Sequence, residues 1–145
     1  MLAYFETSIL LSIIFDEPRK VDAINLWKMY PNKITSIITE VECYNNLHKA
    51  KRMSANPEKE AWLIEKKAEL SALLGEIKFR ILDSEIINLI KTNESLAENR
   101  TLDSIHVGTA YSLSLNSKEK IAMASFDKEI ERSSRKLGFI CDHET

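Results

Sequence analysis

Residues 2–10 read Leu-Ala-Tyr-Phe-Glu-Thr-Ser-Ile-Leu, and this stretch decides the fold. The mostly apolar run from Leu2 to Phe5 predicts a short buried strand, which Glu6 ends. Thr7 or Ser8 can cap the helix that follows, because a hydroxyl oxygen accepts a free N–H of the first turn. A strand that is apolar on both faces belongs in a sheet covered by helices on both sides, and in such sheets sites form where strands end. Glu6 therefore has the position of an active-site residue.

The composition is that of an ordinary soluble protein with one domain, residues 1–145. Hydrophobic residues make up 44% and charged residues 29%, with a net charge of -2. This charge does not demand a nucleic-acid partner, although 20 Lys and Arg can still form local basic patches. Cys43 and Cys141 lie far apart without a CxxC motif, so we expect free thiols. The free thiols, the lack of a signal peptide and the lack of an apolar run long enough to span a membrane together predict a cytoplasmic location.

Strand patterns and helix patterns alternate along the chain. We expect strands at 2–5, 34–38, 77–81, 121–125 and 139–141, the third near an edge because apolar and charged residues alternate in it. The helix after the second strand is expected from about Glu40 to Met53, capped by Thr39 or Ser36, and the polar stretch 93–100 is expected to be a loop or a frayed helix end. The alternation predicts an α/β fold of three α/β/α layers with a mainly parallel, roughly five-stranded sheet.

Four acidic residues lie at strand ends or helix starts: Glu6, Glu42, Asp103 and Asp127. Carboxylates gathered in one pocket repel one another unless a cation neutralises them, and oxygen ligands suit Mg²⁺ or Mn²⁺ better than Zn²⁺. Such a site can activate water and stabilise charge on a phosphate. Taken singly, each of these acids can instead be a helix cap or a partner of the helix dipole.

Other residues give weaker signals. His48, His106 and His143 have no ligand spacing, and we expect His106 to be packed or hydrogen-bonded. Ser8 and Ser125, each near an acid, can orient carboxylates or water. The chain has 3 glycines, too few and too scattered for a phosphate-binding glycine loop.

Four segments together resemble the sequence motifs of PIN-domain ribonucleases. Tyr4–Leu10 is similar to their opening motif, and Thr35–Cys43 to the second, in a register that selects Glu42. Arg100–Ala110 is very similar to the third and most specific motif, and Ala124–Ile130 to the fourth. The four motifs, in the family's order and spacing, cover essentially the whole chain. In its small size the chain is most similar to the VapC type, the toxin of bacterial toxin–antitoxin pairs.

The resemblance implies a Mg²⁺- or Mn²⁺-dependent endoribonuclease that acts on RNA. It implies a homodimer and an antitoxin protein that inhibits by inserting a segment into the acidic groove. Glu6, Asp103 and Asp127 carry over as metal ligands, and Glu42 binds metal directly or through water. Ser125, and Thr7 or Ser8, match the hydroxyl residues beside the acids, and Arg100 matches a basic position that can hold the Asp103 region or meet RNA.

One departure from the family pattern is Glu6, where the family mostly has Asp. The extra methylene moves the carboxylate by roughly one bond length, which matters most for the strict geometry of Mg²⁺. The rival hypothesis is therefore a catalytically weakened PIN-like module that binds RNA or a protein. A doubly wound phosphoryl-transfer domain is a remoter alternative, because it requires an aspartate nucleophile after the first strand and a lysine at a later strand end.

Overall fold

The computed structural model describes residues 1–141, in which strands and helices alternate. The elements in order are β1 (Leu2–Phe5), α1 (Thr7–Ile14), α2 (Lys20–Met29), β2 (Asn32–Ser36), α3 (Ile37–Met53), α4 (Lys59–Leu74), β3 (Lys78–Arg80), α5 (Ser84–Thr92), α6 (Glu94–Ala97), α7 (Thr101–Leu115), β4 (Ala122–Ala124) and α8 (Lys128–Lys136).

The strands form one parallel sheet in the order β3-β2-β1-β4. Tyr4 on β1 lies opposite Ile34 of β2 on one side and Met123 of β4 on the other. All strands of a parallel sheet end at the same edge, so the residues after β1, β2 and β4 become neighbours there. This register brings Glu6 between the ends of two strands far from it in sequence.

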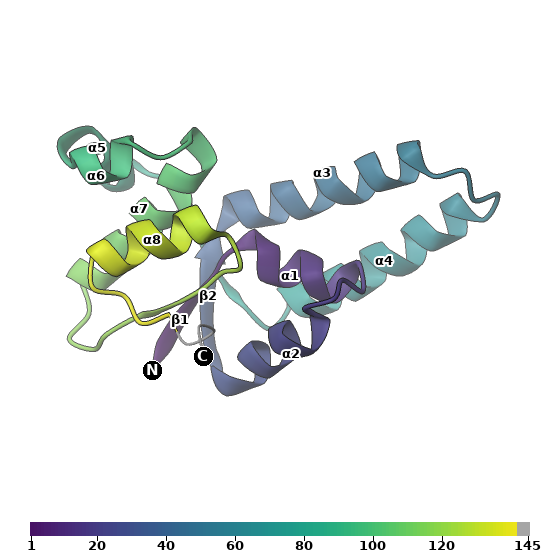
Figure 1. Ribbon diagram of the computed structural model, residues 1–145, viewed down its shortest axis with the longest axis horizontal. Coiled ribbons are helices and arrows are strands. Elements are labelled where there is room, and N and C mark those ends of the chain that lie inside the picture. Colours follow the sequence, from purple (N-terminus) through teal and green to yellow (C-terminus); the bar gives the residue numbers. More distant parts are fainter. Residues whose placement is uncertain (142–145) are drawn as a thin grey trace.

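Helices cover both faces of the sheet, which confirms the three-layer α/β fold (Figure 1). Successive residues of β1 point to opposite faces. Ala3 and Phe5 pack into the core beneath α1 to α4, whereas Tyr4 packs into a second core with residues of α6, α7 and α8. Both cores are closed to water, which explains why β1 is apolar without alternation.

The α3 and α4 helices lie side by side as a long antiparallel pair that extends from the body of the protein (Figure 1). An ion pair between Lys51 and Glu60 joins them near the connecting loop. No helix within residues 1–141 is long and apolar enough to cross a membrane. Cys43 and Cys141 are both free thiols, also as expected.

Some boundary predictions are wrong. β2 ends at Ser36 instead of residue 38, and α3 starts at Ile37 instead of about Glu40, because the Ser36 hydroxyl accepts the N–H of Ile38. Ser36, one of the two predicted caps, is therefore confirmed, and Thr39 lies inside the helix. The cap of α1 is Glu6 instead of Thr7 or Ser8, because its carboxylate reaches forward and accepts the free N–H of Ser8 in the first turn.

The sheet also has one strand fewer than expected. The predicted strand at 139–141 is reduced to an isolated bridge between Ala122 and Ile140. Gly138, in the left-handed region with φ 89°, turns the chain immediately before it and leaves only a short run beside β4. Within the polar stretch 93–100 the chain forms the short helix α6 instead of a loop alone.

Candidate functional site

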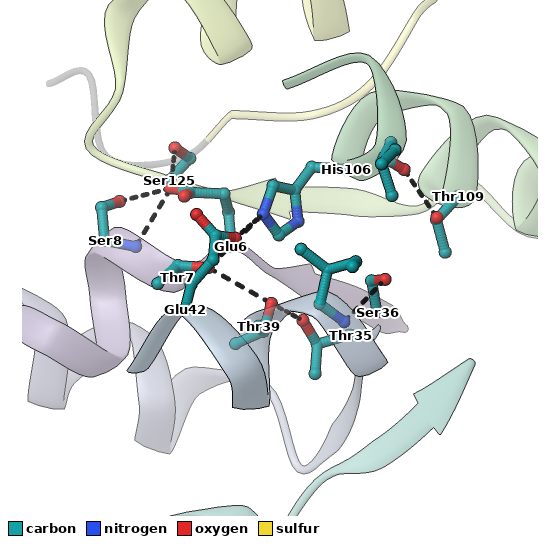
Figure 2. Close-up of polar contacts among 12 residues, drawn as sticks. Glu6, Thr7, Ser8, Thr35, Ser36, Thr39, Glu42, His106, Thr109 and Ser125 are labelled. Atoms are coloured by element: carbon teal, nitrogen blue, oxygen red, sulfur yellow. Dashed lines mark hydrogen bonds and ion pairs between the residues drawn. The ribbon is translucent and has the colours of Figure 1, made fainter. Parts of the chain in front are cut away.

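The four predicted acids come from different elements at the carboxyl edge of the sheet. Glu6 follows β1 and caps α1, and Glu42 lies in the second turn of α3. Asp103 lies in the first turn of α7, and Asp127 follows β4 and caps α8. The contacts around Glu6 and Glu42 are shown in Figure 2.

Glu6 is held through one carboxylate oxygen. Its Oε1 atom accepts hydrogen bonds from the Ser8 hydroxyl (2.6 Å), the Ser8 N–H (3.2 Å) and the Ser125 hydroxyl (2.7 Å). Its Oε2 atom has no hydrogen bond within residues 1–141. Burial raises the pKa of Glu6, although the neighbouring His106 charge and the serine donors act to lower it. The site thus holds a carboxylate whose negative charge is poorly compensated.

The serines join the end of β1 to the end of β4. The Ser125 hydroxyl accepts the N–H of Asp127 (3.0 Å), while the Ser8 hydroxyl accepts the N–H of Phe126 (2.9 Å). Both hydroxyls therefore accept from the backbone after β4 and donate to Glu6. Asp127 in turn accepts the N–H groups of residues 129 and 130 through Oδ1. Glu6 and Asp127 are thus linked through Ser125.

Glu42 is also held through one carboxylate oxygen, which contacts Thr7 and His106. Its Oε1 atom accepts from the Thr7 hydroxyl (2.8 Å) and lies 2.5 Å from Nε2 of His106. Burial acts to raise the pKa of Glu42, yet the hydrogen bonds from His106 and Thr7 outweigh it and hold that pKa below its ordinary value. Burial acts to lower the pKa of His106, but the hydrogen bond to Glu42 and the charge of Glu6 outweigh it and raise that pKa. His106 and Glu42 thus favour an ion pair.

Asp103 is half-buried and no hydrogen bond to its side chain is found within residues 1–141. Burial raises its pKa, and the charge of Asp127 raises it further, while His106 and Arg100 act in the opposite direction. Asp103 and Arg100 line a cleft of about 270 Å³ together with Glu98, Asn99 and Glu129. Asp103 is therefore coupled to the other acids by charge, without a direct contact.

The donor set fits a hard divalent cation in its chemistry. Glu6, Glu42 and Asp127 each keep one carboxylate oxygen without a hydrogen bond in the described chain, and Asp103 keeps both. Ser134 Oγ is the only buried side-chain polar atom of residues 1–141 that lacks a partner, so these carboxylate oxygens reach solvent. Oxygen atoms of this kind are what Mg²⁺ and Mn²⁺ prefer.

The positions of the acids do not form a complete metal site, although their chemistry suits one. In the described part of the chain, no three His, Cys, Asp or Glu side chains converge closely enough to hold a metal ion. Oε1 of Glu6 is held by the serines and Oε1 of Glu42 by Thr7 and His106, which leaves Oε2 of each for a ligand. A shared ion therefore requires the carboxylates to move closer together.

The comparison with protein families decides the relationship. The family model of the PIN domain matches residues 3–136, a range that contains all four acids. This chain belongs to the PIN domain family. PIN domains are in general nuclease modules, typically dependent on divalent metal. No curated protein sequence matches this PIN domain.

Sequence reasoning did not assign two residues, His106 and Arg19, to the site in this PIN domain. The expectation that His106 is packed or hydrogen-bonded is confirmed, and its position one helical turn after Asp103 was a usable signal that it also shares the site. Arg19 gave no signal. Its guanidinium lies 3.7 Å from the ring centroid of Phe126, the residue directly before Asp127. His143 lies outside the described residues.

Proposed function

We propose that this PIN domain, residues 1–145, is a Mg²⁺- or Mn²⁺-dependent endoribonuclease that hydrolyses RNA phosphodiester bonds. The observation that carries this proposal is the linkage at the sheet edge: Ser125 links Glu6 to Asp127, and Thr7, the residue after Glu6, bonds Glu42. Acids brought together from separate elements, without cations to neutralise them all, are typical of a metal-dependent phosphodiesterase site.

In this proposal Glu6, Asp103 and Asp127 hold the divalent ion, and Glu42 binds it directly or through water. The ion, when bound, neutralises charge on the phosphate and acidifies water. The carboxylates hold the ion, and one of them takes the proton of the attacking water. Arg100, exposed beside Asp103 in the same cleft, is positioned to contact the phosphate backbone.

The finer biological role is also part of the proposal. We infer a VapC-like toxin that forms a homodimer and is inhibited by a cognate antitoxin protein. The support is the resemblance in all four motifs together with the PIN-domain match over residues 3–136. We further propose a cytoplasmic location, supported by the two free thiols.

The test is cleavage of end-labelled single-stranded and structured RNA by purified protein, with Mg²⁺ or Mn²⁺ and with EDTA. Wild type should cut only with metal, and Asp103→Asn should abolish cutting. Glu65→Gln, which removes a charge from the exposed surface of α4, is the matched control and should cut like wild type. If Asp103→Asn cuts as well as wild type, the assignment is wrong.

A second candidate is a PIN domain that binds RNA or protein with little catalysis. It is favoured by one observation, the three donors that hold Oε1 of a glutamate at the position where aspartate is usual. Titration of the metal-free protein with Mn²⁺ separates the two. Saturable binding at or below millimolar Mn²⁺ supports the nuclease, whereas retained RNA binding without it supports the binding module.

A further inference from the structure

His106 is a buried polar residue with more partners than packing requires. Its side chain is 1% exposed, and both ring nitrogens are bonded to side chains of other elements. Nδ1 lies 2.6 Å from the hydroxyl of Tyr4 on β1. Nε2 lies 2.5 Å from Oε1 of Glu42 on α3 (Figure 2). A buried imidazole is costly unless its polar atoms are satisfied, and an apolar side chain would fill the same space without that cost.

The hydrogen bonds run in one direction. The Tyr4 hydroxyl accepts the N–H of Ser36 at 3.2 Å, and burial raises the pKa of Tyr4, so the phenol keeps its proton. In the neutral ring that proton is donated to Nδ1 of His106, which places the N–H at Nε2, directed at Glu42. An imidazolium ring also carries a proton at Nε2, so the bond to Glu42 is kept in either charge state.

These hydrogen bonds restrain the side chain of Glu42. Its Oε1 atom is held by His106 and by Thr7, while Oε2 has no hydrogen bond within residues 1–141 and reaches solvent. A glutamate on a helix is otherwise free to occupy several rotamers, and ordering it on metal binding costs free energy. A carboxylate that is already held has lost this freedom before the ion arrives.

We propose that His106, itself held by Tyr4, is a positioning residue that orients Glu42 so that its second oxygen is ready to bind the divalent ion. This inference rests on the proposed function, because it assigns a task to Glu42 in that site. Removal of a residue that orients a metal ligand typically weakens metal affinity 10- to 100-fold. Loss of the His106 N–H should have an effect of about this size.

Two variants of matched chemistry test the inference. In His106→Gln the amide nitrogen reaches about as far from the backbone as Nε2, so it can still donate to Glu42. In His106→Asn the amide reaches only the position of Nδ1, so it can contact Tyr4 but not Glu42. Both variants keep a polar group and lose one of the two bonds, so similar losses in Tm are expected.

The readouts are the Mn²⁺ affinity, measured by the electron paramagnetic resonance signal of free Mn²⁺, and the Tm without metal. We expect His106→Asn to bind Mn²⁺ about 10- to 100-fold more weakly than wild type, and His106→Gln to restore most of that loss. In the metal-free protein, ¹⁵N spectra of the ring should show a proton at Nε2 of His106. Tyr4→Phe should weaken Mn²⁺ binding in the same direction as His106→Asn.

The outcomes separate this inference from the proposed function. Wild type that shows no saturable Mn²⁺ binding refutes the proposed function and this inference with it. Binding that Asp103→Asn abolishes but His106→Asn leaves unchanged refutes the inference alone. Equal weakening in His106→Gln and His106→Asn, in step with equal losses in Tm, would also overturn it, because it would reduce His106 to a structural role.

Discussion

Glu6→Gln and Glu42→Gln should change the stability of the metal-free protein in opposite directions. Burial raises the pKa of Glu6, so its ionised form is disfavoured in the folded state. Glutamine keeps an acceptor oxygen for the Ser8 and Ser125 donors and removes the charge. Glu42 behaves in the opposite way, because its hydrogen bonds from His106 and Thr7 favour the ionised form and hold its pKa down.

The expected magnitudes follow from these contacts. Glu6→Gln should raise the free energy of unfolding by about 0.5–2 kcal/mol, the usual size of a single stabilising substitution. Glu42→Gln should lower it by about 1.5–3 kcal/mol, the range for hydrogen bonds to a charged group. The lower part of that range is expected, because the Glu42 side chain is 22% exposed and water screens the pair. One kcal/mol corresponds to about 3 °C in Tm for a domain of this size.

The two effects depend on pH with different signs. The pKa of Glu6 in the folded state lies above its ordinary value of 4.5, so wild type loses stability relative to Glu6→Gln as the pH rises above 4.5. The stabilisation from Glu42 is present above 4.5 and is lost as the pH falls through its lowered pKa. The stabilisation that comes from charged His106 is complete below its ordinary pKa of 6.5 and is lost as the pH rises through its raised pKa. The cost of Glu42→Gln should therefore be greatest between these two ordinary values.

The assay is urea unfolding followed by circular dichroism in EDTA, at about pH 5 and about pH 7. Glu65→Gln serves as the control and should stay within about 0.5 kcal/mol of wild type. The reasoning is refuted if Glu6→Gln and Glu42→Gln shift the urea midpoint in the same direction at neutral pH. It is also refuted if Glu6→Gln is most stabilising at the lower pH.

Three further predictions concern neighbouring features. Ser125→Ala should lower the free energy of unfolding by about 1–2 kcal/mol, measured by urea unfolding, because Glu6 loses a donor and the N–H of Asp127 loses its acceptor. Gly138→Ala should cost about 1–2 kcal/mol by the same measurement, because φ is 89° there, whereas Gly75→Ala, at φ -68°, should change little; equal effects would contradict the backbone explanation. Arg19→Ala should raise the KM for RNA severalfold with kcat unchanged, because the guanidinium lies over the ring of Phe126, beside Asp127, where RNA would bind. An unchanged KM in steady-state cleavage assays would exclude a contact between Arg19 and RNA.

Local patterns in the sequence predicted most of the fold and the position of each acid. The apolar run of β1, the period of the helices and the placement of Glu6 and Asp127 directly after strands depend on residues a few positions apart. The errors were also local in kind. The run 34–38 is apolar enough for a strand throughout, and only the hydrogen bond between Ser36 and the N–H of Ile38 decides that the helix starts first.

By itself, then, the sequence determined which segments are strands and helices, and that acids follow their ends, because backbone periodicity and capping operate over a few residues. Only the tertiary structure decided how those acids are held. The Ser125 hydroxyl reaches Glu6 across 119 residues, and His106 reaches Glu42 across 64. Both contacts exist because β1 lies between β2 and β4 in a parallel sheet. That strand order is set by the packing of the whole chain, which no local pattern records.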